Sequence, residues 1–173
     1  MPRPRLPFHT AYLGRMSAGV SISGAVALKP RNQQELARFI QAISDPRSRL
    51  FHHYLRRGQY RQLFGPSAAT VSATVGVLRA DGLVVSGVSS NGLMVFFNGN
   101  ANRIKTTFHV QLGHYRLAQG GAGYAPMSAI QLPSSIAGSV RTVVGLDNLV
   151  HLKSADPIRP PASMRGSFPA ART

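Results

Sequence analysis

Six histidines are the side chains of this sequence best suited to bind a metal or to move a proton, and His52 and His53 are adjacent. Adjacent side chains diverge on a helix or a strand, so they rarely share one ion. His109 and His114 are five residues apart, and no carboxylate stands close enough in sequence to complete a familiar zinc site. The spacing therefore predicts no metal site.

Catalysis finds equally little support. Serines are plentiful, but no Gly-x-Ser-x-Gly motif is present, and five acidic residues offer few partners for a histidine base. Glu35 and Asp45 are explained more simply as the start and the end of one helix than as an acid–base pair. The glycine-rich run at 120–123 lacks the Lys-Ser/Thr of a phosphate-binding loop. We expect no catalytic residue in this chain.

The charge balance is strongly basic. The 173 residues include 20 Lys or Arg, 17 of them arginine, against five Asp or Glu, a net charge of +15. Such a field attracts nucleic acid, anionic lipid or an acidic protein surface. Arginine-rich usage can also reflect genomic base composition. The absence of cysteine excludes disulfides, and no apolar run reaches the roughly 18 residues of a membrane span.

The chain length suits one domain, which we place at residues 20–150. Residues 1–19 are expected to be an irregular basic lead-in, and 151–173 a linker or tail rich in Pro and Arg. The stretch 16–28 could be a signal peptide, but it alternates apolar with small residues, which predicts a strand with one buried face. The residues of that face are Val20, Ile22, Val26 and Leu28.

Three helices are predicted next. Asn32 and Glu35 form a capping-box pattern before an amphipathic helix that ends at Asp45-Pro46. Its apolar stripe consists of Leu36, Phe39, Ile40 and Ile43. A short helix is expected over 57–64. Ser67 should cap the third, which ends at Asp81-Gly82 and turns Val71, Val75 and Leu78 inward.

The second half begins with a hairpin. Asn91-Gly92 between apolar runs at 83–88 and 93–98 is a strong hairpin signal. Asn100 is then expected to cap a helix that reaches Val110, before a strand at 114–117, an irregular segment from 118 and a short helix or turn at 134–139. This order predicts an α+β fold: a ferredoxin-like split βαβ antiparallel sheet with helices on one face and an extra helical insertion.

The hairpin is apolar on both faces, so one face would remain after the chain's own helices cover the other. Met94 and Phe96 lie on that second face and are candidate partner-docking residues. The extra helical segment or residues 118–150 could cover it instead. RNA-recognition modules share this sheet, but here Phe96 and Phe97 lack the basic lead of their signature.

Several short motifs follow one another along roughly residues 17–150. Their residues are Asp45, Pro46, Ser48, Tyr54, Leu55, Phe64, Gly65, Pro66, Gly82, Phe108, Gly145, Leu146 and Asp147. Taken in order, these motifs resemble the activation domain of pro-kumamolisin-type peptidases, the sedolisin or serine-carboxyl family. Asp45-Pro46 is interpreted as a helix stop, Ser48 as a turn residue, and Tyr54-Leu55 as an anchor of the next segment to the core. This sequence departs from the family pattern at Arg49, Leu50 and Phe51 and in its histidines.

The resemblance implies a prosegment of a secreted, acid-acting peptidase, an intramolecular chaperone and inhibitor removed by autoproteolysis. The implied partner is the cognate catalytic domain, expected to be acidic and to carry a Ser-Glu-Asp triad and calcium. This chain would bind no cofactor, would not touch a membrane and would be a monomer. A basic ferredoxin-like module that binds nucleic acid is the alternative. His52, His53, His109 and His114 are candidates for a response to pH.

Overall fold

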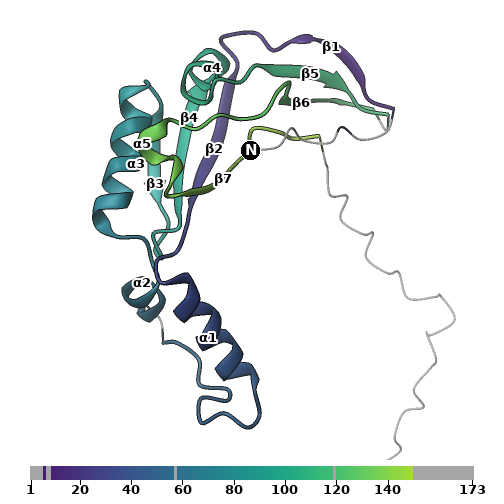
Figure 1. Cartoon of the computed structure of the whole chain (residues 1–173). Helices are drawn as coiled ribbons and strands as arrows, with labels where there is room; N and C mark the ends of the chain where they lie inside the picture. The colour runs from purple at the N-terminus through teal and green to yellow at the C-terminus, as the bar shows by residue number, and fades with distance from the viewer. Residues whose placement is uncertain (1–5, 7–8, 57, 119, 150–173) are drawn as a thin grey trace, which may run out of the picture.

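A computed structural model describes residues 6, 9–56, 58–118 and 120–149 (Figure 1). The predicted tail at 151–173 lies outside these residues. The elements are β1 (Ala11–Arg15), β2 (Ser21–Leu28), α1 (Gln33–Ser44), α2 (Gln59–Leu63), α3 (Ala68–Ala80), β3 (Val84–Val88), β4 (Met94–Asn100), α4 (Ala101–Phe108), β5 (Leu112–Arg116), β6 (Ala122–Pro126), α5 (Ser134–Ala137) and β7 (Val140–Val144).

The main sheet has the strand order β3-β4-β2-β7, and all of its pairs are antiparallel. Two split βαβ units interleave to give this order: α1–α3 connect β2 to β3, and the segment with α4 and α5 connects β4 to β7. This arrangement confirms the predicted ferredoxin-like α+β fold.

The core lies between one face of this sheet and helices α3, α4 and α5. Val26 pairs with Val95 in the register of β2 and β4, and both side chains are fully buried. Phe97 contacts Phe108 of α4 with ring centroids 5.6 Å apart. Leu78, from the predicted stripe of α3, is fully buried in the same cluster.

A second sheet, of order β1-β5-β6, extends to one side of the main sheet (Figure 1). The expectation of an irregular lead-in over 1–19 is therefore wrong for Ala11–Arg15, and the irregular segment from 118 contains β6. The predicted strand at 114–117 corresponds to β5, which lies in this second sheet. The sequence missed β1 because its pairing partner β5 is distant in the chain, and it missed β6, which forms a hairpin with β5, because Gly123 and Pro126 obscure the strand pattern.

Most of the local signals are confirmed. The Ser67 hydroxyl accepts a hydrogen bond from Thr70 N and the Asn100 side chain from Arg103 N, so both residues cap their helices. The 89–92 turn joins β3 to β4, with Gly92 at φ +76°. The capping box is wrong, because Asn32 has a left-handed backbone and no side-chain cap. Val20 is exposed, because β2 begins one residue later.

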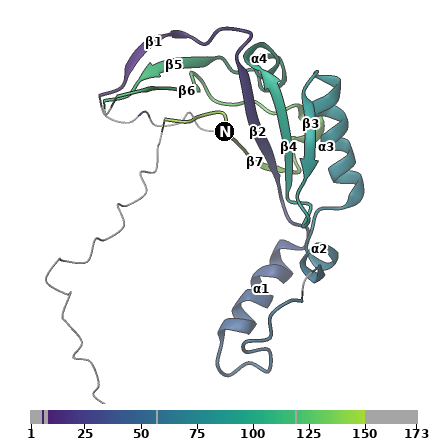
Figure 2. The same ribbon diagram turned by 180° about the vertical axis from the view of Figure 1, so that it is seen from behind.

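Helix α1, the following loop and α2 project from the end of the main sheet (Figures 1 and 2). We call residues 32–56 and 58–63 the arm. It is closed at its base by a backbone hydrogen bond from Arg31 N to Phe64 O, 2.9 Å, and the Arg31 side chain donates to the carbonyls of Gln62 and Leu63. Helix α1 has no buried residue. Its apolar stripe is thus not part of the core.

Candidate docking surface

The face of the main sheet opposite the helices carries exposed apolar side chains in register. Ala25 of β2 pairs with Phe96 of β4 on one side and with Val144 of β7 on the other, which places the three in one row across the sheet. Phe96 and Val144 are each 43% exposed, and Val84 of β3 is 66% exposed. Ala25, between these two larger neighbours, is buried.

Small and polar side chains border this row. Ser23 pairs with Asn98, and its hydroxyl donates to Asn98 Oδ1 at 2.7 Å. On the other side Ala27 pairs with Met94 and with Thr142. We call the three rows together the open face. It combines an apolar central row with borders that mix polar side chains, such as Ser23, Asn98 and Thr142, with apolar ones, and such a mixture is usual for a protein-binding surface.

The open face is open because the helices pack elsewhere. Helices α3 and α4 contact β2, β3 and β4 through the buried side chains of the core, and the arm projects past the end of the sheet. Figure 2 shows the strands from behind, with the arm again below them. The two predicted docking residues, Met94 and Phe96, lie on this face; Val84 and Val144 were missed, because only the register with β3 and β7 brings them there.

The stretch 44–55, which carries several motif residues, forms the tip of the arm. Asp45 Oδ1 accepts a hydrogen bond from Arg47 N, and Ser48 Oγ accepts one from Leu50 N, so both side chains shape turns. Tyr54 is 70% exposed, so the expectation that it anchors the next segment to the core is wrong. Pro46 is exposed and Leu55 is half-buried.

His52 lies in an aromatic stack at this tip. Its backbone is left-handed, φ +59°, and its ring stacks on Phe51 at a centroid distance of 3.8 Å and faces Tyr54 at 6.1 Å. Within the described residues, no three His, Asp or Glu side chains are grouped closely enough to hold a metal ion. The histidines therefore do not assemble into a site in this part of the chain.

The other motif residues lie in the core or at the ends of helices. Phe64 is buried against the rings of Phe39 and Tyr60, and it is followed by the buried Gly65 and by Pro66 at the base of the arm. At the far end of the main helix layer, Gly82 ends α3 with a φ of +83°, and Phe108 is fully buried on α4. These residues set the shape of the domain and do not line the open face.

The closing motif joins the two sheets. Leu146 is buried in the core, and Gly145 O accepts a hydrogen bond from the Tyr124 hydroxyl of β6 at 3.1 Å. Burial raises the pKa of Tyr124, and the negative charge of Asp147 raises it further. Asn148 Oδ1 accepts a bond from Tyr124 N, so the chain after β7 is fastened to β6. The motif thus fixes where the chain leaves the main sheet.

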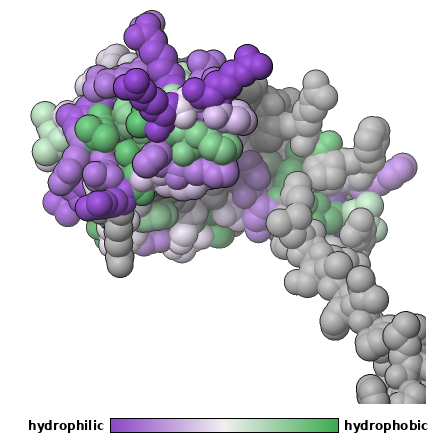
Figure 3. Space-filling model, turned by 90° about the horizontal axis from the view of Figure 1, so that it is seen from below, coloured by the Kyte–Doolittle hydropathy of each residue, from purple (hydrophilic) through white to green (hydrophobic). Residues whose placement is uncertain are grey.

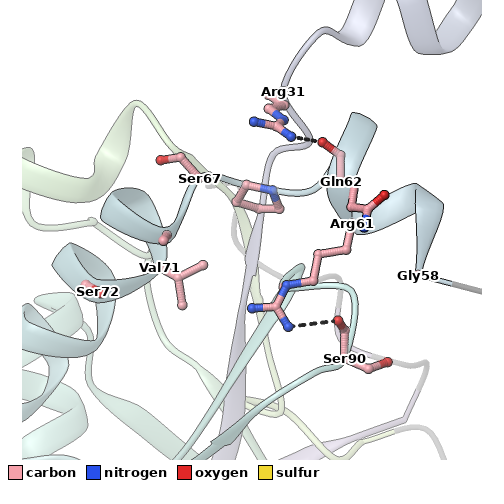
Figure 4. A pocket seen from close by; sticks show the side chains of 11 residues that line it. Arg31, Gly58, Arg61, Gln62, Ser67, Val71, Ser72 and Ser90 are labelled. Atoms are coloured by element: carbon pink, nitrogen blue, oxygen red, sulfur yellow. Dashed lines mark hydrogen bonds between the residues drawn. The ribbon is translucent and has the colours of Figure 1, made fainter.

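A cavity of about 740 Å³, which sequence reasoning did not predict, lies at the base of the arm (Figure 4). Arg31, Arg61, Ser67 and Ser90 line it, together with residues of the β3–β4 turn. Arg61 Nη1 donates to Ser90 O at 3.3 Å across this space. No motif signals such a cavity, because its walls come from four separate segments.

The fold is a small α+β module whose main sheet carries an exposed apolar row. The chain belongs to the family of pro-kumamolisin activation domains, whose model matches residues 9–149. It is 34% identical over 139 residues to sedolisin of Pseudomonas sp. (strain 101), a match that covers 80% of this chain and 24% of that protein. It is 32% identical over 124 residues to xanthomonalisin of Xanthomonas sp. (strain T-22), covering 72% and 15%. The chain thus spans a quarter or less of the curated relatives, in their N-terminal parts.

The family match begins at residue 9, just before β1. It therefore includes the second sheet as well as the ferredoxin-like one. Among the described residues, no helix combines the length and the apolar character needed to cross a membrane.

Proposed function

We propose that this chain is the prosegment of a secreted sedolisin-type peptidase and acts as its intramolecular chaperone and inhibitor. Its partner is the catalytic domain, against which the open face docks. The observation that carries this proposal is the row of Phe96, Ala25 and Val144, which the chain's own helices leave uncovered. The family membership supplies the kind of partner.

Burial of this row would drive docking. Full burial of one large apolar side chain contributes about 1.5–3 kcal/mol, and Phe96 and Val144 are each 43% exposed before binding. Each would add roughly half of that amount on docking. The row ends at β7, five residues before Leu149, so the chain that continues toward the cleavage linker leaves from the edge of the docking surface.

Charge would select the partner. A module of net charge +15 repels a second copy, which supports a monomer, and is attracted to an acidic catalytic domain. Protonation of the partner's carboxylates at low pH would weaken that attraction, in keeping with release by acid. Binding that does not change between about pH 4 and pH 7 would contradict this part of the proposal.

The test is inhibition of the mature catalytic domain of sedolisin by the purified chain. Phe96→Asp places a charge in the centre of the open face and should raise the inhibition constant at least about tenfold. Leu13→Asp is the matched control, because Leu13 on β1 is exposed to the same extent but lies on the second sheet. Equal effects of the two substitutions would refute docking through the open face.

The net charge keeps nucleic-acid binding as a second candidate. RNA binding that falls steeply with salt, together with no inhibition of the peptidase, would favour that alternative. Inhibition without RNA binding would favour the prosegment.

A further inference from the structure

The arm carries exposed apolar side chains that nothing in the described chain covers. Ile40, in the stripe of α1, is 51% exposed, and Leu50, Tyr54 and Leu63 are also exposed. Figure 3, seen from the end where the arm projects, shows green apolar side chains among long hydrophilic ones. The apolar residues come from α1, from the loop and from α2, so they belong to the whole arm.

An arm built in this way gains little from its own packing. Isolated helices shorter than about 12–15 residues are marginal in water, and protein helices are stabilised mainly by burying an apolar face. Helix α1 has 12 residues and buries none of them. The contacts that hold the arm lie at its base, where Arg31 binds the Gln62 and Leu63 carbonyls and Phe39 meets Phe64. Of the stripe, Leu36, Phe39 and Ile43 are half-buried, and Ile40 is exposed and available to a partner.

The charge of the arm decides what kind of partner fits. Residues 32–63 contain six arginines and two acidic residues, a net charge of +4. A second copy would bring two positively charged arms together, and they would repel each other. The chain's own segment 150–173 has four basic residues and one acidic residue, so it is repelled as well. The apolar stripe with its arginine neighbours is complementary to an acidic surface that contains an apolar groove.

The cavity at the base of the arm agrees with an acidic partner. Arg61 makes one long hydrogen bond there, to Ser90 O, and Figure 4 shows its guanidinium within the space between α2, α3 and the β3–β4 turn. A guanidinium can take a carboxylate with two parallel hydrogen bonds. An acidic side chain of the partner fits this position beside the arm.

We propose that the arm is a second docking element, separate from the open face, that inserts its apolar side chains into an acidic groove of the catalytic domain. The inference rests on the proposed function and adds a distinct contact to it. The open face and the arm then contact the partner at two separate places, and the base of the arm at Arg31 and Phe64 connects these two surfaces.

The first experiment compares neighbouring positions of α1. Ile40→Asp puts a charge in the stripe, and Gln41→Asp puts the same charge about 100° further round the helix, on an exposed position outside the stripe. Against the mature catalytic domain of sedolisin, I40D should raise the inhibition constant about tenfold or more, and Q41D should leave it within about twofold. Circular dichroism checks that both variants remain folded.

The second experiment tests the charge. Arg47→Glu with Arg49→Glu reverses two charges on the arm, and Arg79→Glu with Arg116→Glu reverses two on α3 and β5. The arm pair should weaken inhibition more than the body pair, and the difference should shrink as salt is added. Equal effects would mean that only the total charge matters, which would overturn the role of the arm.

The results separate the two proposals. If F96D weakens inhibition and I40D behaves like Q41D, the arm is not a docking element and the proposed function stands. If the unsubstituted chain does not bind the catalytic domain, both proposals fail. If I40D instead loses binding to phosphatidylserine vesicles or to RNA while inhibition is unchanged, the arm recognises a different class of partner and this inference is wrong.

Discussion

Gly145→Ala should destabilise the fold severely, because two separate constraints meet at this position. Its φ is +86°, a conformation that costs a residue with a side chain about 1–3 kcal/mol. A Cβ built there would lie 2.6 Å from Ser23 O and 2.8 Å from Gly24 Cα, both backbone atoms of β2. Overpacking against atoms that cannot rotate away costs typically about 1–3 kcal/mol. Together we expect a loss of about 2–6 kcal/mol in the free energy of unfolding.

Two other glycines separate the two effects. Gly120 has the same φ of +86°, and nothing lies within 4 Å of the place a Cβ would take, so Gly120→Ala should cost only the backbone strain. Gly138 has a helical backbone, φ −63°, and equally open surroundings, so Gly138→Ala should be neutral or should stabilise by about 0.4–1 kcal/mol. Urea unfolding followed by circular dichroism measures all three, provided that the m-value is unchanged.

The three glycine variants can also refute this reasoning. If Gly145→Ala costs no more than Gly120→Ala, the chain after β7 can move away from Ser23 and the close approach is not a constraint. If Gly145→Ala costs several kcal/mol while Gly120→Ala costs about one, the contact with β2 supplies the difference.

Three further outcomes are expected. Thr107→Val should stabilise the protein by about 1 kcal/mol in thermal unfolding, because this buried hydroxyl has no hydrogen-bond partner among the residues that the structure describes, whereas Thr74→Val should not, because Thr74 donates to a helix carbonyl. The pKa of Tyr124 is raised in the folded protein above the ordinary value of 10.0, so the contribution of this residue to stability is fully present below pH 10.0 and is lost as the pH rises through the folded-state pKa. Tyr124→Phe should remove this alkaline loss of stability, which unfolding curves at high pH would measure. Ser67→Ala should cost about 1 kcal/mol in urea, and Asn32→Gly should cost nothing, because only Ser67 makes a cap bond.

Local chemistry predicted the parts of the fold that depend on neighbours in sequence. Ser67 and Asn100 cap their helices, and Asn91-Gly92 closes the hairpin, because a turn or a cap is decided within about four residues. The same kind of signal failed at Asn32, where the bond from Arg31 N to Phe64 O fixes the chain and the backbone turns left-handed.

Strands whose partners are distant could not be predicted in this way. β1 (Ala11–Arg15) is short, and it pairs with β5 over a separation that no local pattern reports. β6 (Ala122–Pro126) pairs with β5 as a hairpin and was missed because Gly123 and Pro126 obscure its strand pattern. For the same reason as with β1, the sequence predicted only part of the open face. The alternation of β4 exposed Phe96, but Val144 joins it only through the pairing of β7 with β2. The stripe of α1 was visible as a pattern, and only the structure shows that it is not buried.

The base of the arm also affects which changes in chain length the fold can accept. The bond between Arg31 N and Phe64 O closes the segment 32–63 into a loop whose two ends meet beside the sheet. The entropy of closing such a loop grows only slowly with its length, by about 0.6 kcal/mol for each doubling. Insertions or deletions between Pro46 and Arg56 would therefore leave the register of β2 and β4 unchanged. The arm is the place where this fold can lengthen or shorten at almost no thermodynamic expense, so its reach can be adjusted independently of the sheet.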